Sequence, residues 1–324
     1  MPASGHSHFG KGCMIPLSAA EKKPFELQWT VNEAVLLRAF LQEQSISKRA
    51  LTDIKFTGGR IEVNGQEENV RYQLLKGDKV RVVFPPEVPS EGIKAEPVPL
   101  AVLYEDDAFI AVAKPPGMNT IPSREHPTGS LASGLLWLYE ERCLQATAHI
   151  VTRLDRDTSG IVLAAKNRYV HHLLSDMQKK KLVSRRYEAL AEGVLIDSTG
   201  VIEAPIGRSD TSIIERTVRA DGQFARTAYE VIQQHETFAH VTVKPETGRT
   251  HQIRVHFAHI GHPLAGDDLY GGGCAQIARQ SLHCGSLQFP HPLTGQQVSV
   301  TMPLPDDMQQ LLKEEKMKQT EKPE

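Results

Sequence analysis

An aspartate flanked by two arginines is the part of this sequence best suited to chemistry. Asp155 lies between Arg153 and Arg156, in a polar segment that leads directly into an apolar run at residues 161–165. Neighbouring cations favour the ionised form of a carboxylate, and a strand behind the segment can hold it rigidly. The pattern therefore indicates a fixed anionic nucleophile or base. Because a surface turn with ordinary ion pairs fits the same residues, the rest of the chain must decide between the two interpretations.

The composition is that of an ordinary globular protein with room for one large and one small domain. The chain has 324 residues, 40% hydrophobic and 23% charged, with a formal net charge of −2. Nucleic-acid binding would therefore need basic residues gathered in patches. There is no apolar run long enough to cross a membrane, and the four cysteines lack the spacing of a disulfide framework or zinc site. We expect a cytoplasmic protein with reduced cysteines.

The chain divides by composition into five segments. Residues 1–24 are expected to be a disordered tail, because they lack the apolar core of a signal peptide; translation could start at Met1 or at Met14. A small α/β module at 25–84, a proline-rich linker at 85–99 and a large domain at 100–305 follow. A charged tail at 306–324 is expected to start as a helix and fray.

The small module is predicted to contain two helices followed by strands. Apolar spacing predicts the first helix around residues 36–41, and Ser47 is suited to capping a second over 48–56. A strand over 60–63 meets an Asn-Gly turn, which predicts a hairpin. One face of the module would carry the cations Lys48, Arg49, Lys55 and Arg60. These could bind RNA phosphates, although solvated helix charges have the same pattern.

In the large domain, helices are predicted over 130–138, capped near Thr128, and after Asn167, which can cap the next one. Lys114 begins a rigid Lys-Pro-Pro-Gly turn. The strand over 183–191 places Tyr187 on one face with small alanines, so a nucleobase could stack on its ring. A core tyrosine is the commoner outcome for an aromatic residue in a strand.

A helix ending near Gly261 is predicted from Ile253, Phe257 and Ile260, which form one buried stripe. Arg254 flanks that stripe, and a partly buried arginine normally pairs with a carboxylate or a phosphate. Several histidines follow at close spacing, but they lack a His-Glu-x-x-His pattern and an acidic ligand. No metal is therefore expected.

Four elements together resemble a known family. The turn at 114–117, the segment 153–160, Tyr187 and the segment 248–256 occur in the order seen in the RluA family of RNA pseudouridine synthases. The small module likewise resembles an S4 RNA-binding domain. The resemblance implies an α+β fold with a mixed, mainly antiparallel central sheet, flanking helices and a catalytic cleft, plus the small α/β S4 domain.

The resemblance also implies roles for individual residues. In the family the aspartate at Asp155 is catalytic, the tyrosine at Tyr187 stacks on the target base, and the arginine at Arg254 pairs with the aspartate. Arg153 matches the residue that helps to extrude the target nucleotide, while Arg156 and Lys114 are expected to contact RNA with the four cations of the module. One departure is Thr152, where the family often has histidine.

The implied reaction is isomerisation of uridine to pseudouridine by a monomer that needs no cofactor and no metal. Whether Asp155 would add to the base or assist elimination at the ribose stays open. Large-subunit ribosomal RNA is the expected substrate, with tRNA as the alternative. Two other interpretations are a non-catalytic RNA-binding assembly factor and a nucleosidase or glycoside hydrolase, in which Asp157 would be a second carboxylate.

Overall fold

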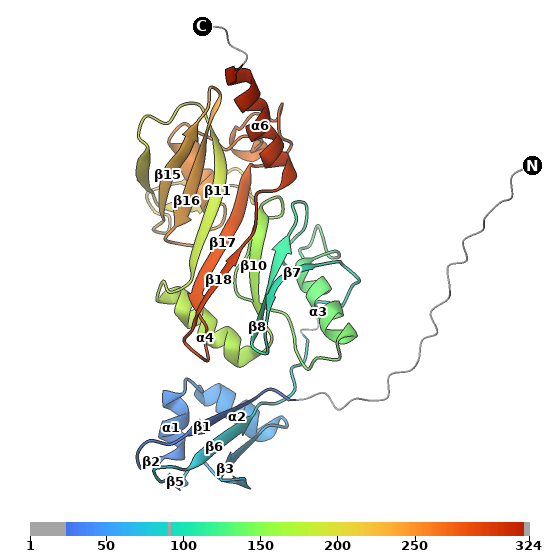
Figure 1. Ribbon diagram of the computed structural model, residues 1–324, viewed down its shortest axis with the longest axis vertical. Coiled ribbons are helices and arrows are strands. Elements are labelled where there is room, and N and C mark those ends of the chain that lie inside the picture. Colours follow the sequence, from blue (N-terminus) through green and yellow to red (C-terminus); the bar gives the residue numbers. More distant parts are fainter. Residues whose placement is uncertain (1–23, 90–91, 321–324) are drawn as a thin grey trace, which may run out of the picture.

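The computed structural model describes residues 24–89 and 92–320, which form a small N-terminal module and a larger domain (Figure 1). All but the last residue of the expected disordered tail lie outside the described residues. None of the helices within them is long and apolar enough to span a membrane.

The N-terminal module has two small sheets and two helices. Its four-stranded antiparallel sheet has the order β1 (Glu26–Thr30), β6 (Lys79–Val83), β3 (Arg60–Val63), β4 (Gln66–Glu67). The other elements are β2 (Val35–Leu36) paired with β5 (Gln73–Leu74), α1 (Leu37–Glu43) and α2 (Lys48–Phe56). The predicted cap is confirmed, because Ser47 Oγ accepts a hydrogen bond from the Ala50 backbone N–H at 3.1 Å. The predicted hairpin is confirmed too, with Asn64 and Gly65 at φ 52° and 84° between β3 and β4.

One ten-stranded sheet organises the large domain. Its main path runs β12 (Thr199–Glu203), β15 (Arg226–Gln234), β16 (Phe238–Pro245), β11 (Ser184–Glu192), β17 (Leu282–Pro290), β10 (Ser159–Ala165), β8 (Phe109–Lys114), β7 (Ala101–Glu105). Beside it, β18 (Gln297–Thr301) pairs with β17 and β9 (His149–Ile150) with β10, while β13 (Ile206–Arg208) and β14 (Arg216–Val218) form a separate hairpin. Within the described residues the strand pairs are antiparallel except β10–β17. The predicted mixed, mainly antiparallel sheet is confirmed.

Helices cover both faces of this sheet. They are α3 (Leu131–Glu141), α4 (Arg168–Lys179), α5 (Gln252–His259), the 3-10 turn η1 (Asp268–Tyr270) and α6 (Asp306–Thr320). Alternate residues of β10 join two different cores: Leu163 packs in the cluster that includes α4, and Val162 packs in the one that includes α3 and α5. This central strand is therefore buried on both faces, and it carries the Asp155 segment at its N-terminal end.

Side chains cap the N-termini of α3 and α4, where the sequence predicted caps. Asn167 caps α4 as predicted, accepting a hydrogen bond from the Val170 N–H at 2.9 Å. The cap of α3, predicted near Thr128, is Ser130, whose Oγ accepts from the Ser133 N–H at 3.1 Å. Two serines and a threonine stand close together there, and the side-chain geometry that selects one of them is not visible in the sequence.

The C-terminal segment starts as a helix, as expected, and that helix packs against the domain; residues 321–324 lie outside the described range. Helix α6 extends to Thr320 and buries Met308 and Leu311 in a cluster with Leu190 and Phe238. In the sequence these apolar residues stand among many charged ones, so the packing of this helix was not predicted. Residues 306–320 are therefore part of the packed domain.

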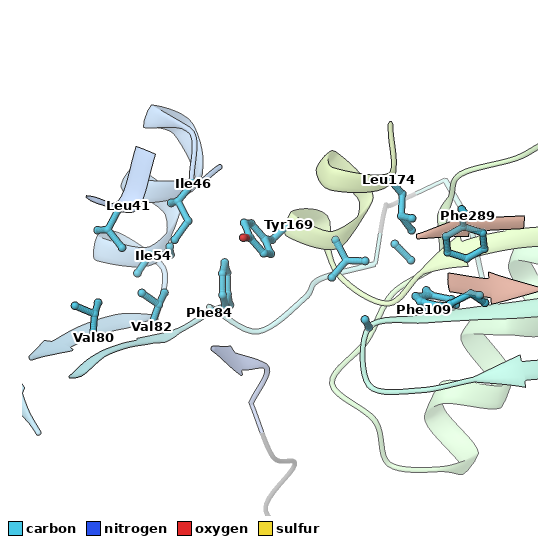
Figure 2. Packing of buried hydrophobic residues seen from close by; sticks show 14 of the residues in the cluster. Leu41, Ile46, Ile54, Val80, Val82, Phe84, Phe109, Tyr169, Leu174 and Phe289 are labelled. Carbon is cyan, nitrogen blue, oxygen red and sulfur yellow. The ribbon is translucent and has the colours of Figure 1, made fainter. Parts of the chain in front are cut away.

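The N-terminal module packs directly against the large domain (Figure 2). The ring of Phe84 lies 4.9 Å from that of Tyr169 on α4, and the Tyr169 hydroxyl donates to the Gln44 carbonyl at 2.7 Å. The linker is fixed here too, since Glu87 accepts from the Arg168 N–H at 2.7 Å and lies 2.9 Å from His149 Nε2.

Gly160 tests how tightly the parallel pair β10–β17 is packed. A Cβ at this position would lie 2.5 Å from the backbone N and O of Cys284, and the φ of Gly160 is +128°. Gly160→Ala should therefore lower the free energy of unfolding by about 3 kcal/mol or more. Urea denaturation measures the change. Gly261→Ala is the matched control: its φ is +83° with open space around it, so only about 1 kcal/mol of backbone strain is expected. Equal effects of the two variants would contradict the close packing.

Candidate active site

Residues 152–159, here called the aspartate loop, are held to the domain at almost every position. Thr152 Oγ1 accepts from the Leu163 N–H at 2.9 Å. Thr120 Oγ1 donates to the Leu154 carbonyl at 2.9 Å and accepts from the Leu154 N–H at 3.2 Å. Thr152, which replaces the frequent family histidine, is buried and structural in this protein. Asp155 therefore projects from a backbone that is fixed on its N-terminal side.

The C-terminal side of the loop is fixed as firmly. Arg279 Nη1 donates to the Asp157 carbonyl at 3.0 Å, while its Nε and Nη2 bind the Asp307 carboxylate of α6 at 2.6 and 2.9 Å. Ser159 Oγ lies 2.9 Å from His283 Nδ1 on β17. The loop thus connects the last helix with the central sheet.

Lys114 also anchors the aspartate loop. Its buried position contradicts the RNA contact that the sequence led us to expect. It is fully buried, and its Nζ donates to the carbonyls of Pro115, Met118 and Arg156 at 3.0, 2.8 and 2.7 Å. With its three N–H groups used, it has none left for the RNA contact expected of it. Burial lowers the pKa of Lys114 to about 7, against the opposing charges of Asp157 and Asp155. Its role is to hold the aspartate loop against the turn at 114–117.

Helix α5 brings Arg254 to the loop. The predicted stripe is confirmed, because Ile253, Phe257 and Ile260 pack in one cluster. Burial extends beyond that stripe, since Gln252 through Phe257 are all buried. Arg254 has the carboxylate partner that its burial predicted, but the closest one is Asp267. Arg254 Nε and Nη2 each donate to Asp267 at 2.7 Å, and Nη1 lies 3.7 Å from Asp155 Oδ2. Asp155 itself is 28% exposed.

This arrangement keeps a permanent positive charge beside Asp155. Burial lowers the pKa of Arg254, but the hydrogen bonds and charge of Asp267, together with the charge of Asp155, raise it above its usual value. The guanidinium carbon also lies 4.9 Å from the centre of the Tyr270 ring. Because Asp267 uses the two best-aligned donors, Arg254 acts on Asp155 by its charge and leaves the carboxylate open to other partners.

His251 and Tyr187 complete the surroundings of Asp155. His251 Nε2 lies 4.0 Å from Asp155 Oδ1. Tyr187 is on β11, next to a register shift between Arg186 and Tyr187, and only 5% of its surface is exposed. Burial raises its pKa, so the phenol stays neutral, and the nearby charge of Asp155 adds to this. Tyr187 is therefore mostly a core residue.

The remaining predicted RNA contacts lie in two places. Arg153 and Arg156 are exposed on the aspartate loop, with Arg156 Nη1 3.8 Å from Asp157 Oδ1. In the N-terminal module Lys48, Arg49 and Lys55 are exposed on α2, whereas Arg60 is engaged by Glu62 at 2.6 Å. The module is at the far end of the molecule from β15 and α6 (Figure 1).

Sequence reasoning missed the residues that hold the site from a distance. Asp267, Tyr270, Thr120 and Arg279 were not singled out, and His251 was considered only as a metal ligand. The Gly-Asp-Asp-Leu-Tyr-Gly run at 266–271 has the composition of a flexible loop, although a buried arginine needs an acidic partner from elsewhere. Within residues 24–89 and 92–320, no group of three or more His, Cys, Asp or Glu side chains could hold a metal ion.

Comparison with known proteins agrees with this fold. Residues 108–259 match the family model of the RNA pseudouridylate synthases. The chain is 50% identical over 279 residues to "Uncharacterized RNA pseudouridine synthase YjbO" of Bacillus subtilis, which covers 86% of this chain and 99% of that protein. It is 34% identical over 312 residues to "Ribosomal large subunit pseudouridine synthase D" of Pseudomonas aeruginosa, covering 91% and 95%. Human RNA Pseudouridylate Synthase Domain Containing 4 shares the fold, with a TM-score of 0.56 at 20% identity over 67% of this chain and 93% of that one.

The chain therefore belongs to the RluA family of RNA pseudouridine synthases. It is an isomerase that acts on uridines in RNA.

Lys114→Met tests the anchoring of the aspartate loop. The substitution keeps the length of the side chain but leaves three carbonyls without their donor, so the free energy of unfolding should fall by about 3 kcal/mol at pH 7. Urea denaturation at several pH values gives a second check. In the folded state the Lys114 pKa of about 7 is below its ordinary value of 10.5. The unfolded state therefore binds more protons between these values, and wild type should gain stability over Lys114→Met as pH rises from 7 to 10. A difference independent of pH would contradict the lowered pKa of Lys114 in the folded state.

Proposed function

We propose that this enzyme converts specific uridines of large-subunit ribosomal RNA to pseudouridine, with Asp155 as the catalytic carboxylate. The observation that carries the proposal is the position of Asp155, a partly exposed carboxylate on a fixed loop with its Oδ2 3.7 Å from the buried guanidinium of Arg254. The ribosomal substrate is supported by 34–35% identity to proteins named "Ribosomal large subunit pseudouridine synthase D".

The reaction is an isomerisation that balances without a redox partner. The N1–C1′ bond of uridine breaks, the uracil turns over, and C5 bonds to C1′ while the C5 proton is lost to solvent and N1 gains one. An anionic Asp155 would act as nucleophile or base in this sequence. Arg254 supplies a positive charge near the carboxylate, while its own closest hydrogen bonds go to Asp267.

The target base has to leave its stack before Asp155 can reach it, at a cost of a few kcal/mol. Arg153 is exposed at the start of the aspartate loop, where its side chain can occupy the space that the base vacates. Tyr187 would supply a neutral aromatic surface beside Asp155. Both roles follow the family resemblance.

The N-terminal module would supply a second RNA contact, in the manner of an S4 domain. Its α2 exposes Lys48, Arg49 and Lys55 on one short helix, and Ser47 fixes the start of that helix. Cations on a rigid helix can bind backbone phosphates without reading sequence. A ribosomal RNA substrate would place the enzyme in the cytoplasm.

Asp155→Asn should abolish pseudouridine formation while RNA binding persists. The amide has nearly the same shape but can act neither as nucleophile nor as base, so we expect a rate loss of about 1000-fold or more. Ribosomal RNA transcripts would be incubated with purified protein and pseudouridine mapped by chemical probing. Asp157→Asn is the matched control on the same loop: it binds Arg279 through its backbone carbonyl, which the substitution preserves.

The same assay separates the alternatives. Full activity of Asp155→Asn would refute the catalytic assignment, and release of free uracil would indicate a nucleosidase. Modification of tRNA but not of ribosomal transcripts would identify tRNA as the substrate. Absence of product from wild type on both, with binding retained, would favour an RNA-binding assembly factor.

Lys48→Ala combined with Arg49→Ala tests the second contact. Loss of two phosphate contacts should weaken RNA binding and reduce the slope of log Kd against log salt by about two, with kcat unchanged. Fluorescence anisotropy with labelled RNA measures both values. Lys313→Ala combined with Lys318→Ala removes the same charge from α6 and should leave the slope as in wild type. Equal changes in the two double variants would show a general charge effect instead.

A further inference from the structure

His251 has an unusual backbone conformation at the start of α5. Its φ and ψ are 56° and 19°, in the left-handed region that residues with a side chain seldom adopt. This conformation places the imidazole between two loops, with Nδ1 2.8 Å from the Tyr270 hydroxyl and Nε2 4.0 Å from Asp155 Oδ1. A strained residue whose side chain faces a candidate catalytic group points to a role at that group.

The hydrogen bonds of Tyr270 assign the protons of this imidazole. The backbone N–H of Arg216 donates to the Tyr270 hydroxyl oxygen at 3.0 Å, so one of its lone pairs is occupied. The O–H of Tyr270 then has His251 Nδ1 as its acceptor among the described residues. When the Tyr270 O–H donates to Nδ1, the ring proton is on Nε2, the nitrogen that faces Asp155.

We propose that Tyr270 and His251 are positioning residues of this pseudouridine synthase: Tyr270 fixes the tautomer of a neutral His251, whose Nε2–H orients the Asp155 carboxylate. The inference rests on the proposed catalytic role of Asp155. The carboxylate is then oriented from two sides, with Oδ1 facing the imidazole and Oδ2 facing Arg254. Both separations exceed a hydrogen bond, so the two groups act on the carboxylate through the N–H dipole and the guanidinium charge, and its oxygens stay open to substrate.

The charges around His251 favour its neutral form. Burial lowers the pKa of His251; Asp155 and Asp267 raise it, and Arg254 and Arg216 lower it further. The balance is a pKa below the usual histidine value. A neutral N–H orients the carboxylate without neutralising it, whereas an imidazolium would pair with Asp155 and reduce its basicity.

Tyr270→Phe is the sharpest test, because it removes the O–H and keeps the ring beneath Arg254. We expect kcat to fall by about 10- to 100-fold, with KM within about two-fold of wild type, because a misoriented reacting group affects turnover more than binding. The acidic limb of the kcat–pH profile should also move to higher pH, since Nδ1 loses the donor that keeps it unprotonated. Tyr104→Phe is the matched control, as its hydroxyl hydrogen-bonds Asp106 at 3.1 Å on β7, away from the site.

Substitutions of His251 give an independent comparison. His251→Gln keeps an N–H donor on a side chain of similar reach, so it should retain more activity than His251→Ala. If Tyr270→Phe does not fold, this pair carries the kinetic test. Equal activity of the two His251 variants would overturn the proposal.

The tautomer can be observed without any substrate. Nitrogen-15 NMR of histidine-labelled protein should show His251 with a protonated Nε2 and an unprotonated Nδ1 at pH 7, its signals assigned by their loss in His251→Gln. Tyr270→Phe should shift them towards a mixture of tautomers. A protonated Nδ1 or a charged ring in wild type would overturn the inference.

These outcomes also separate the inference from the proposed function. Full activity of Asp155→Asn would remove the catalytic role of Asp155. With Asp155→Asn inactive, a wild-type kcat and pH profile for Tyr270→Phe would overturn only the positioning role.

Discussion

The site depends on a guanidinium that has to be buried and paired. Arg254 is 6% exposed, and leaving such a charge without a partner costs about 3–5 kcal/mol. Asp267, fully buried, satisfies it with two hydrogen bonds of 2.7 Å. That pairing draws the segment after α5 back over the helix and brings η1, with Tyr270, next to the aspartate loop. One electrostatic requirement therefore determines where three separate segments meet.

The division of work between two carboxylates follows from this pairing. Asp267 is buried and accepts the directed hydrogen bonds of Arg254, so it serves as the structural partner of that guanidinium. Asp155 Oδ2 lies 3.7 Å from Nη1 of the same arginine, and the Asp155 side chain is 28% exposed. The positive charge therefore acts on Asp155 while its carboxylate stays accessible to substrate. The loop that carries Asp155 is held by its backbone, through Thr120, Lys114 and Arg279, so its side chain needs no structural partner. The backbone atoms of the loop thus make it rigid, while the side-chain oxygens of Asp155 stay accessible to substrate.

What could be predicted from the sequence is largely what neighbours in the chain determine. The caps Ser47 and Asn167 and the Asn-Gly hairpin depend on residues within three positions, and each forms as expected. The partner of Arg254 was missed because it comes from a glycine-rich segment that resembles a loop. Lys114 was misassigned because a sequence cannot show that three backbone carbonyls surround a lysine. Asp155 was singled out by its flanking arginines and by the family resemblance, and Arg254 by its place beside a buried stripe; the structure brings their side chains within 3.7 Å of each other.

The contact between Phe84 and Tyr169 affects how the whole chain unfolds. Buried residues of the N-terminal module, including Leu41, Ile54 and Val82, belong to the same hydrophobic cluster as Phe109 and Phe289 of the central sheet (Figure 2). Domains joined by a free linker melt separately, but parts that share a core lose it together. The contact between the module and the larger domain therefore couples the unfolding of the module to that of the sheet.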